Sequence, residues 1–560
     1  MQFIIDMVHH NPGEKPFNTA FINPEKLVEY HYHRQVFKHI NCVATFAELN
    51  KDIFPEGSEE MRWLMEFSKG IKNEINRAKK KGLKVFYHID LFVLPKRLVE
   101  IYKDDICIDG TDFITIDKEM TLKIHSIMID EIFRTYPEVD GFIIRVGETY
   151  LEDTPYHTGN GAVPLRGQFA DPATEKDKYV KLLNFLREEV CVKHGRYLIH
   201  RTWDTSPVKF HANLDYYLYV TDRVEPHEKL LFSIKHTALD FWRRVKFNDC
   251  LTKGKHPQII EVQCQREYEG KGAYPNYIMD GVINGFEEIK EKKVIKDIIN
   301  HPLIKGVYTW SRGGGWFGPY LQNEFWCDLN AYVIANYAAD PSRTEEEIFK
   351  QYCREKMGLN EKDTEIFRKI CLLAARAVLK GRYCEAYDKT LDEKIMPTGN
   401  WMRDDRLGGY LQLNDIYEYL YQNNLFEAAL KEKEESVALW KEIKELSSTI
   451  HVPDSQLKEY IEISTEYAVL LFSVVLCGWE IMVEGFKAKK TGTCDYKKMK
   501  DRIMQYDKLW SEYRKLKETH PCCATLYEGR SLAVPYEKTI PGLDAAVDEC
   551  RQILRENGFS

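Results

Sequence analysis

The chain of 560 residues lacks three features that would define its class at once. It has no uninterrupted apolar run of about 18 residues, the length of a membrane helix, and no cysteine or histidine spacing typical of zinc. It also lacks an excess of positive charge: 79 basic and 87 acidic residues give a formal net charge of −8. We therefore expect no nucleic-acid partner and no membrane partner, because both need a positive field or an apolar span.

The 14 cysteines lie at irregular intervals from Cys42 to Cys550, mostly inside apolar runs. This pattern predicts reduced core residues rather than a disulfide framework, and we expect no metal and no cofactor. The N-terminal segment MQFIIDMVHHNPGE has no basic start and contains Asp6, so it predicts a strand rather than a signal peptide. We expect a cytoplasmic protein, although a periplasmic or secreted origin with the signal removed stays open.

Short apolar runs alternate with longer amphipathic segments through about residue 320. This alternation is typical of a parallel sheet covered by helices, and eight such units close into an α/β fold of the (β/α)₈ type, a TIM barrel. The expected strands are Phe3–Val8, Cys42–Phe46, Val85–Ile89, Gly141–Arg145, Tyr197–Arg201, Leu230–Lys235, Ile259–Cys264 and Gly306–Trp310. Helices are expected between them, at Glu59–Lys81, Lys118–Thr135, Lys176–His194 and Gly285–Asn300. An open doubly wound sheet is the main alternative, but no GxGxxG follows an early strand.

After Pro319 the pattern becomes helical almost to the end, with apolar residues at i, i+3 and i+4. Clear cases are Leu413–Tyr421, Ser436–Ile450 and Tyr467–Phe486, and Thr491–Asp495 predicts a surface turn. We therefore expect a barrel over residues 1–320 and an all-α region over residues 321–560. The helical region would pack on the barrel or serve a homodimer.

Charged and aromatic residues follow several predicted strands, where the active site of such a barrel lies. These candidates are Arg145, Glu148, Arg201, Trp203, Lys235, Asp240, Glu267, Trp310 and His88. Several consecutive strand ends that carry carboxylates together with cations would be costly to bury unless they are paired or used. The pattern therefore predicts a polar site at the barrel mouth.

Each candidate also has a purely structural interpretation. Glu148 could pair with Arg145, Asp240 could cap a helix, and Glu267 could be a solvated member of a charged string. Arg201 and Lys235 could neutralise nearby carboxylates, and His88 could be a hydrogen-bonded residue of the rim. No HxH or HExxH spacing supports a metal.

Two segments resemble motifs of glycoside hydrolase family 67, the α-glucuronidases. Phe232–Phe241 (FSIKHTALDF) resembles the family's strand-six signature, and Glu261–Gly270 (EVQCQREYEG) is similar to its next strand. The strand GFIIRVGE and the helical passage after the eighth strand also match in order, so the resemblance spans about residues 141 to 353.

The resemblance implies that Glu148 is the general acid and that Asp240 and Glu267 flank the attacking water. It places Arg145, Arg201 and Lys235 on the positions that bind the substrate carboxylate, and Arg and Lys suit that role chemically. We also expect Trp203, Trp310 and His88 to contact the sugar. The expected reaction is release of a uronic acid from an oligosaccharide by an inverting exo-α-glucuronidase.

This sequence departs from the family pattern in ways that put the exact substrate in doubt. The loop from Arg145 to Glu148 is one residue shorter, Arg145 replaces the usual Lys, and Thr237-Ala238 replaces a Gly-Pro pair. The family normally has a β-rich domain before its barrel, whereas here the first predicted strand begins at Phe3. Two alternatives therefore stay open: a retaining hydrolase of a neutral or acetamido sugar, and a barrel that binds carbohydrate without catalysis.

Overall fold

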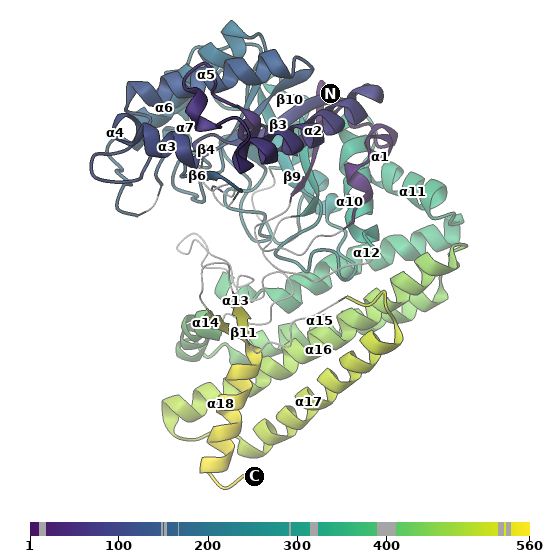
Figure 1. The fold of residues 1–560 in the computed structure, drawn as a ribbon. Helices are drawn as coiled ribbons and strands as arrows, with labels where there is room; N and C mark the ends of the chain where they lie inside the picture. The colour runs from purple at the N-terminus through teal and green to yellow at the C-terminus, as the bar shows by residue number, and fades with distance from the viewer. Residues whose placement is uncertain are drawn as a thin grey trace.

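The barrel and the helical region are the two parts of the protein, seen here in a computed structural model (Figure 1). The structure describes residues 1–9, 18–146, 149, 154–165, 167–289, 293–313, 323–388, 410–524, 531–533 and 539–559. Eight parallel strands close into a barrel in the order β1-β10-β9-β8-β7-β5-β3-β2. The predicted (β/α)₈ barrel followed by an all-α region is confirmed.

The barrel strands are short and almost fully buried, as expected for parallel strands covered on both faces. They are β1 (Phe3–His9), β2 (Arg34–Lys38), β3 (Lys84–Asp90), β5 (Val139–Arg145), β7 (Tyr197–Arg201), β8 (Leu230–Lys235), β9 (Gln258–Gln263) and β10 (Ile304–Gly313). Two further strands, β4 (Val93–Pro95) and β6 (His157–Gly159), pair outside the barrel.

The inside of the barrel is filled by alternate residues of the strands. Its apolar cluster contains Phe3, Ile5, Met7, Val36, Phe86, Ile143, Ile199, Leu231, Ile259, Tyr308 and Trp310. Because side chains alternate along a strand, the residues two and four positions further along also face inward. This alternation decides which polar side chains reach the barrel mouth.

The crossovers between strands differ in how much helix they contain. Helices occur as α1 (Pro24–Glu29), α2 (Glu59–Lys80), α3 (Lys96–Ile101), α4 (Lys103–Ile106), α5 (Glu119–Thr135), α6 (Glu175–Leu186), α7 (Leu214–Thr221), α8 (Met279–Asn284) and α9 (Ile295–Ile298). Residues 236–257, all of them described, join β8 to β9 without a helix. On the side of β8 and β9, the barrel must therefore be covered by another part of the chain.

One expected strand and one expected helix are wrong. The strand predicted at Cys42–Phe46 is in fact β2, eight residues earlier, and a 3-10 helix covers Ile40–Val43. His39 ends β2 because its backbone is left-handed, with φ 71°. The helix predicted at Gly285–Asn300 is also wrong. Gly285 (φ 112°) caps the end of α8, and within the described part of the predicted range only α9 is helical.

The remaining helices follow the barrel. They are α10 (Phe325–Ala339), α11 (Glu345–Lys356), α12 (Glu361–Arg382), α13 (Glu385–Asp388), α14 (Tyr410–Gln422), α15 (Phe426–Thr449), α16 (Ser455–Thr491), α17 (Tyr496–Thr519) and α18 (Leu543–Glu556). A small pair of strands, β11 (Ser531–Ala533) and β12 (Thr539–Pro541), precedes α18. The predicted turn after Thr491 is present, with Gly492 left-handed at the end of α16.

Helix α10 packs against β10 and β1 and so covers the barrel. The boundary predicted at residue 320 falls outside the described residues and stays a prediction. Figure 1 shows α12 between the barrel and the pair α15 and α16. A hydrogen bond joins the two parts: Tyr460 of α16 donates to the carbonyl of Gly272, 3.1 Å away.

The long helix α16 is apolar enough, by length and composition alone, to cross a membrane. Most of its apolar stretch is buried inside the protein, as in the core helix of a helical bundle. All 14 cysteines are described and unpaired, and 12 of them are buried.

Candidate active site

Predicted cations and an aromatic residue meet on the inner face at the mouth of the barrel. Arg145, Arg201 and Lys235 end the neighbouring strands β5, β7 and β8, each in register with the inward-facing residues of its strand. Trp310 lies on β10, and the guanidinium of Arg201 is 4.8 Å from the centre of its ring. The structure therefore brings these side chains together.

Arg145 forms a buried ion pair with Asp90 at the end of β3. Its Nε donates to Asp90 Oδ1 over 3.0 Å, and its Nη2 donates to both carboxylate oxygens over 2.7 Å. Since such a fork is the strong geometry for an arginine and a carboxylate, Asp90 fixes where Arg145 points.

Arg201 forms a second buried pair, with Glu261 of β9. Its Nε and Nη2 donate to the two carboxylate oxygens over 3.1 and 2.6 Å, and the hydroxyl of Ser233 donates to Oε2 over 3.0 Å. The side chains of Arg201 and Glu261 are 1% and 0% exposed. This pair therefore lies in the floor of the mouth.

Lys235 and Asp240 form the third pair, at 2.5 Å between Nζ and Oδ1. The ammonium also lies 3.6 Å from the ring centre of Trp203 and 4.6 Å from that of Phe241. Tyr268 donates its hydroxyl to the other oxygen of Asp240, 2.5 Å away. A cation and a hydroxyl thus hold Asp240 at the edge of an aromatic enclosure.

Glu267 lies beside the inward-facing end of β9. Its backbone N–H donates to Gln263 Oε1, and Gln263 Nε2 donates to Glu267 Oε2, both over 3.0 Å. Glu267 is 5% exposed. The structure therefore places it near the floor of the mouth rather than in a solvated loop.

Two polar ring atoms at the mouth have no hydrogen-bond partner among the described atoms. They are His88 Nε2 on β3 and Trp310 Nε1 on β10, both buried. Burial, followed by the nearby charges of Arg145 and Arg201, lowers the pKa of His88 well below its usual value, so the ring is neutral. Trp310 Nε1 can donate a hydrogen bond to a bound hydroxyl, and His88 Nε2 can donate or accept one according to its tautomer.

Glu148, the expected general acid, lies outside the described residues, so its position relative to Asp240 and Glu267 stays a prediction. Among the described residues, no group of three or more His, Cys, Asp or Glu side chains is arranged to hold a metal ion.

Sequence reasoning missed several residues of the mouth. Lys38 contacts His9 over 3.1 Å, and the ring of His9 lies 4.8 Å from that of Trp310. Lys38 was missed because the second strand was placed too late in the sequence. Asp90 could have been found, since it ends its strand as the other candidates do, and Tyr268 directly follows Glu267.

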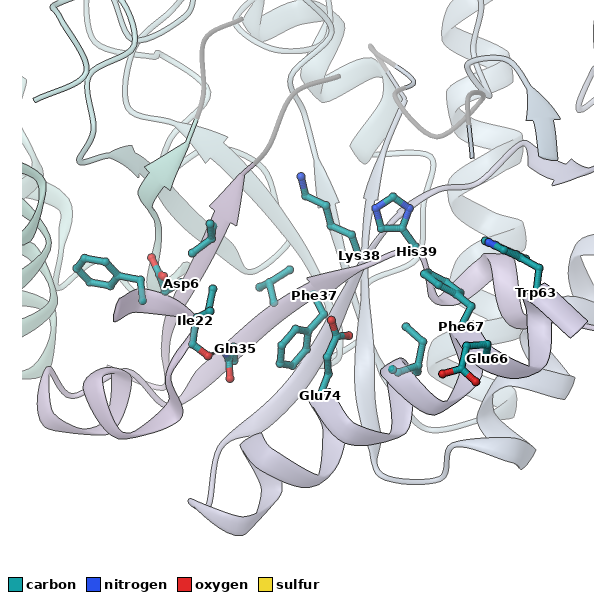
Figure 2. Close-up of a pocket in the computed structure, with 15 residues that line it drawn as sticks. Asp6, Ile22, Gln35, Phe37, Lys38, His39, Trp63, Glu66, Phe67 and Glu74 are labelled. Atoms are coloured by element: carbon teal, nitrogen blue, oxygen red, sulfur yellow. Dashed lines mark hydrogen bonds between the residues drawn. The ribbon is translucent and has the colours of Figure 1, made fainter. Parts of the chain in front are cut away.

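A hollow of about 550 Å³ lies outside the barrel, between β1, β2 and α2. Figure 2 shows Lys38 and His39 at one end of it and Trp63, Phe67 and Glu74 along α2. The described part of the crossover from β1 to β2 contains only a 3-10 turn at Ala20–Ile22 and the six-residue helix α1, so this flank is thinly covered. Its walls are mainly apolar, unlike the charged mouth.

The comparisons with known proteins bear on the fold. No protein-family model and no curated protein matches the sequence. Among solved structures, a GH138 enzyme targeting pectin rhamnogalacturonan II is similar with a TM-score of 0.55 at 10% identity, over 100% of this chain and 68% of that chain. The chain therefore shares the fold of this enzyme.

Two further similarities are too weak to argue from. An O-GlcNAc hydrolase of Thermobaculum terrenum gives a TM-score of 0.36 at 12% identity, over 99% of this chain and 94% of that chain. A GH20 exo-β-N-acetylglucosaminidase of Vibrio harveyi gives 0.33 at 10% identity, over 63% and 57%. None of these comparisons singles out family 67.

Proposed function

We propose that this protein is a glycosidase that releases a uronic acid from an oligosaccharide, as an inverting exo-α-glucuronidase does. One observation carries the proposal: Asp240 and Glu267 share the mouth with two ring atoms, His88 Nε2 and Trp310 Nε1, that have no hydrogen-bond partner in the described part of the chain. Buried polar atoms without partners are costly, and the hydroxyl groups of a sugar would satisfy them. The partner would be an oligosaccharide, and the cations Arg145, Arg201 and Lys235 at the same mouth favour one that bears an acidic sugar.

In this proposal each carboxylate has one role in a single displacement. Glu148 protonates the leaving oxygen as the bond from the anomeric carbon to that oxygen breaks. Water forms the new bond to that carbon from the opposite face, and Asp240 or Glu267 accepts the proton that the water loses. The ion pair with Lys235 and the hydrogen bond from Tyr268 hold the two oxygens of Asp240 in place, which suits a base that must face the attacking water.

The sugar would be held by the aromatic rings and by the cations. Trp203 and Trp310 lie at the mouth, each with a cation over its ring, and Arg145, Arg201 and Lys235 supply positive charge. The GH138 enzyme of similar fold targets pectin rhamnogalacturonan II, and a polysaccharide-derived substrate would suit the present chain as well.

The ion pairs also favour a second candidate, the hydrolysis of a neutral or acetamido sugar. Arg145, Arg201 and Lys235 each already contact a carboxylate of the protein. If those pairs persist in the complex, an incoming uronate meets little net positive charge. The two candidates differ in whether the cations bind substrate or only brace the mouth.

A panel of α- and β-linked uronides, with the matching neutral glycosides, tests these candidates together. The anomeric proton of the released sugar, followed by NMR, gives both the substrate and the stereochemistry. We expect a uronic acid of inverted configuration from the wild type and a loss of about 10²–10⁴ in kcat for Glu148→Gln. Equal rates on uronides and neutral glycosides would contradict the acidic-sugar proposal, and no turnover at all would favour a binding protein.

Lys235→Met separates the two roles of the cations. It should lower kcat/KM for a uronide at least about tenfold more than for the matching neutral glycoside, which serves as the internal control. An equal loss on both substrates would mean that Lys235 only positions Asp240.

We also propose that the helical region mediates a homodimer, which sedimentation velocity would test.

A further inference from the structure

The loop after β9 carries Glu267 and Tyr268 and is buried along almost its whole length from Cys264 to Tyr277. Two of its non-glycine residues have a left-handed backbone, Arg266 with φ 57° and Lys271 with φ 52°. Such conformations are unfavourable for side-chain-bearing residues and persist only where the surroundings impose them. The loop therefore needs strong anchors.

Glu269 is the first anchor, and it is fully buried. It accepts hydrogen bonds from Arg266, Arg243 and Asn276 at 2.9, 3.2 and 2.8 Å. Burial alone would raise the pKa of Glu269, but the two guanidinium groups outweigh burial and lower it below its usual range. Glu269 is therefore a carboxylate that ties this loop to Arg243, in the helix-free crossover from β8 to β9.

Helix α12 of the helical region supplies the second anchor. Arg382, at its end, donates from Nη1 to the carbonyl of Tyr268 over 2.9 Å and from Nε to the hydroxyl of Tyr274 over 2.6 Å. The next residue, Tyr383, accepts the backbone N–H of Arg243 on its hydroxyl, 3.1 Å away. Arg382 is 1% exposed, so these bonds are shielded from water.

The side chain of Tyr268 passes this restraint on to the mouth. Its ring stacks on Trp242, with 3.6 Å between centroids, and its hydroxyl donates to Asp240. Trp203, Trp242, Tyr268, Leu379 and Tyr383 form one buried cluster with Leu239. The contacts therefore run without interruption from α12 to the carboxylate of Asp240.

We infer that the helical region completes the active site: α12 positions Tyr268, and Tyr268 orients Asp240. This inference rests on the proposed function for the role of Asp240. Arg382 and Tyr383 are positioning residues, since they act through Tyr268 and Arg243. The helical region is then part of the catalytic apparatus and not only a surface for assembly.

Kinetics of three variants test the chain of contacts. Tyr268→Phe keeps the ring and removes the hydroxyl, so we expect kcat to fall about 10- to 100-fold with KM changed less than about twofold. Lys235, which also contacts Asp240, is unchanged in this variant.

Arg382→Lys keeps a positive charge but loses the fork, and should lower kcat about tenfold. Arg376→Lys is the matched control on the same helix, since Arg376 is 55% exposed and pairs only loosely with Glu287 at 3.6 Å. If Arg382→Lys proves unstable, Tyr383→Phe removes a single hydroxyl from the same anchor. Wild-type kinetics in Tyr268→Phe, or in both anchor variants, would overturn the inference.

Hydrogen exchange keeps the inference separate from the proposed function. In Arg382→Lys, but not in Arg376→Lys, peptides covering residues 264–278 should exchange at least about tenfold faster than in the wild type. Unchanged exchange would overturn the positioning role whatever the substrate. Faster exchange in a protein that cleaves no glycoside would instead refute the proposed function while leaving the anchor in place.

Discussion

At the scale of single residues, the mouth is built from charges taken out of water. The pair of Arg201 and Glu261 is almost completely buried, so each charge depends on the other for its stability. We predict that Glu261→Gln lowers the free energy of unfolding by about 3–5 kcal/mol, because it leaves a buried guanidinium without its counter-ion. Urea denaturation measures the change.

An exposed ion pair serves as the control for the buried one in the same denaturation experiment. Glu66→Gln removes the partner of an exposed lysine, Lys69, and should change stability by less than about 1 kcal/mol. Similar losses in the two variants would show that water reaches Arg201.

Asp6 shows how burial creates a dependence on pH. Burial raises its pKa from 3.8 to about 7, although Thr309 and Ser311 donate hydrogen bonds to it. The folded protein therefore binds a proton that the unfolded chain releases near pH 4, so this group destabilises the fold as the pH rises from about 4 to 7. Asp6→Asn should remove that loss.

The measurement is the free energy of unfolding of both proteins between pH 5 and pH 8. We expect the wild type to lose stability relative to Asp6→Asn across this range, by up to a few kcal/mol, on the order of 1.4 per pKa unit. Parallel curves would contradict the assignment.

At the scale of elements, replacing a glycine by alanine should have opposite effects on stability in α2 and in β10. A Cβ atom on Gly70 of α2 would meet nothing within 4 Å, whereas one on Gly306 would lie 1.7 Å from the carbonyl oxygen of Phe3. Gly70→Ala should raise the free energy of unfolding by about 0.5–1 kcal/mol, because alanine favours helix.

Gly306→Ala is the opposite case, since β10 pairs with β1 along the seam that closes the barrel. We expect this variant to be strongly destabilised or insoluble. Thermal melting of the two variants checks both expectations, and a stable Gly306→Ala protein would mean that the seam can open.

The sequence predicted most elements but not all of their positions. Seven of the eight strands follow apolar runs that are buried on both faces, and periodicity identifies such runs directly. The second strand, RQVFK, carries two basic residues and few apolar ones. The more apolar segment CVATF nearby was therefore predicted as the strand instead. Arg34 is tolerated there because its guanidinium packs on Phe3 and donates to a backbone carbonyl.

The site residues that lie at the ends of barrel strands were predictable from the sequence. Lys235, Arg201 and Trp310 were identified because parallel strands present their last residues at one mouth. The carboxylate that pairs with each cation was not predictable. Asp90 and Glu261 lie beside their partners because of the order of the strands around the barrel, which the sequence does not reveal. The contribution of Arg382 depends on a contact across 114 residues, which no local pattern contains.

At the scale of the whole molecule, the barrel and the helical region share a buried boundary. Arg382, Tyr383 and Tyr460 all bond to loops of the barrel from helices of the other part. We predict one cooperative thermal transition for both parts, observed by calorimetry as a single peak. Two resolved peaks would show that the helical region melts independently of the barrel.

The helix-free crossover between β8 and β9, braced from α12, sets an order of events during synthesis. A ribosome releases the strands of the barrel well before it has made Arg382, because the chain emerges from its N-terminus onward. The nascent barrel can close, yet its mouth stays unbraced until Arg382 and the rest of α12 have emerged. The newborn protein would then become competent late, when its helical part folds back onto a barrel already formed.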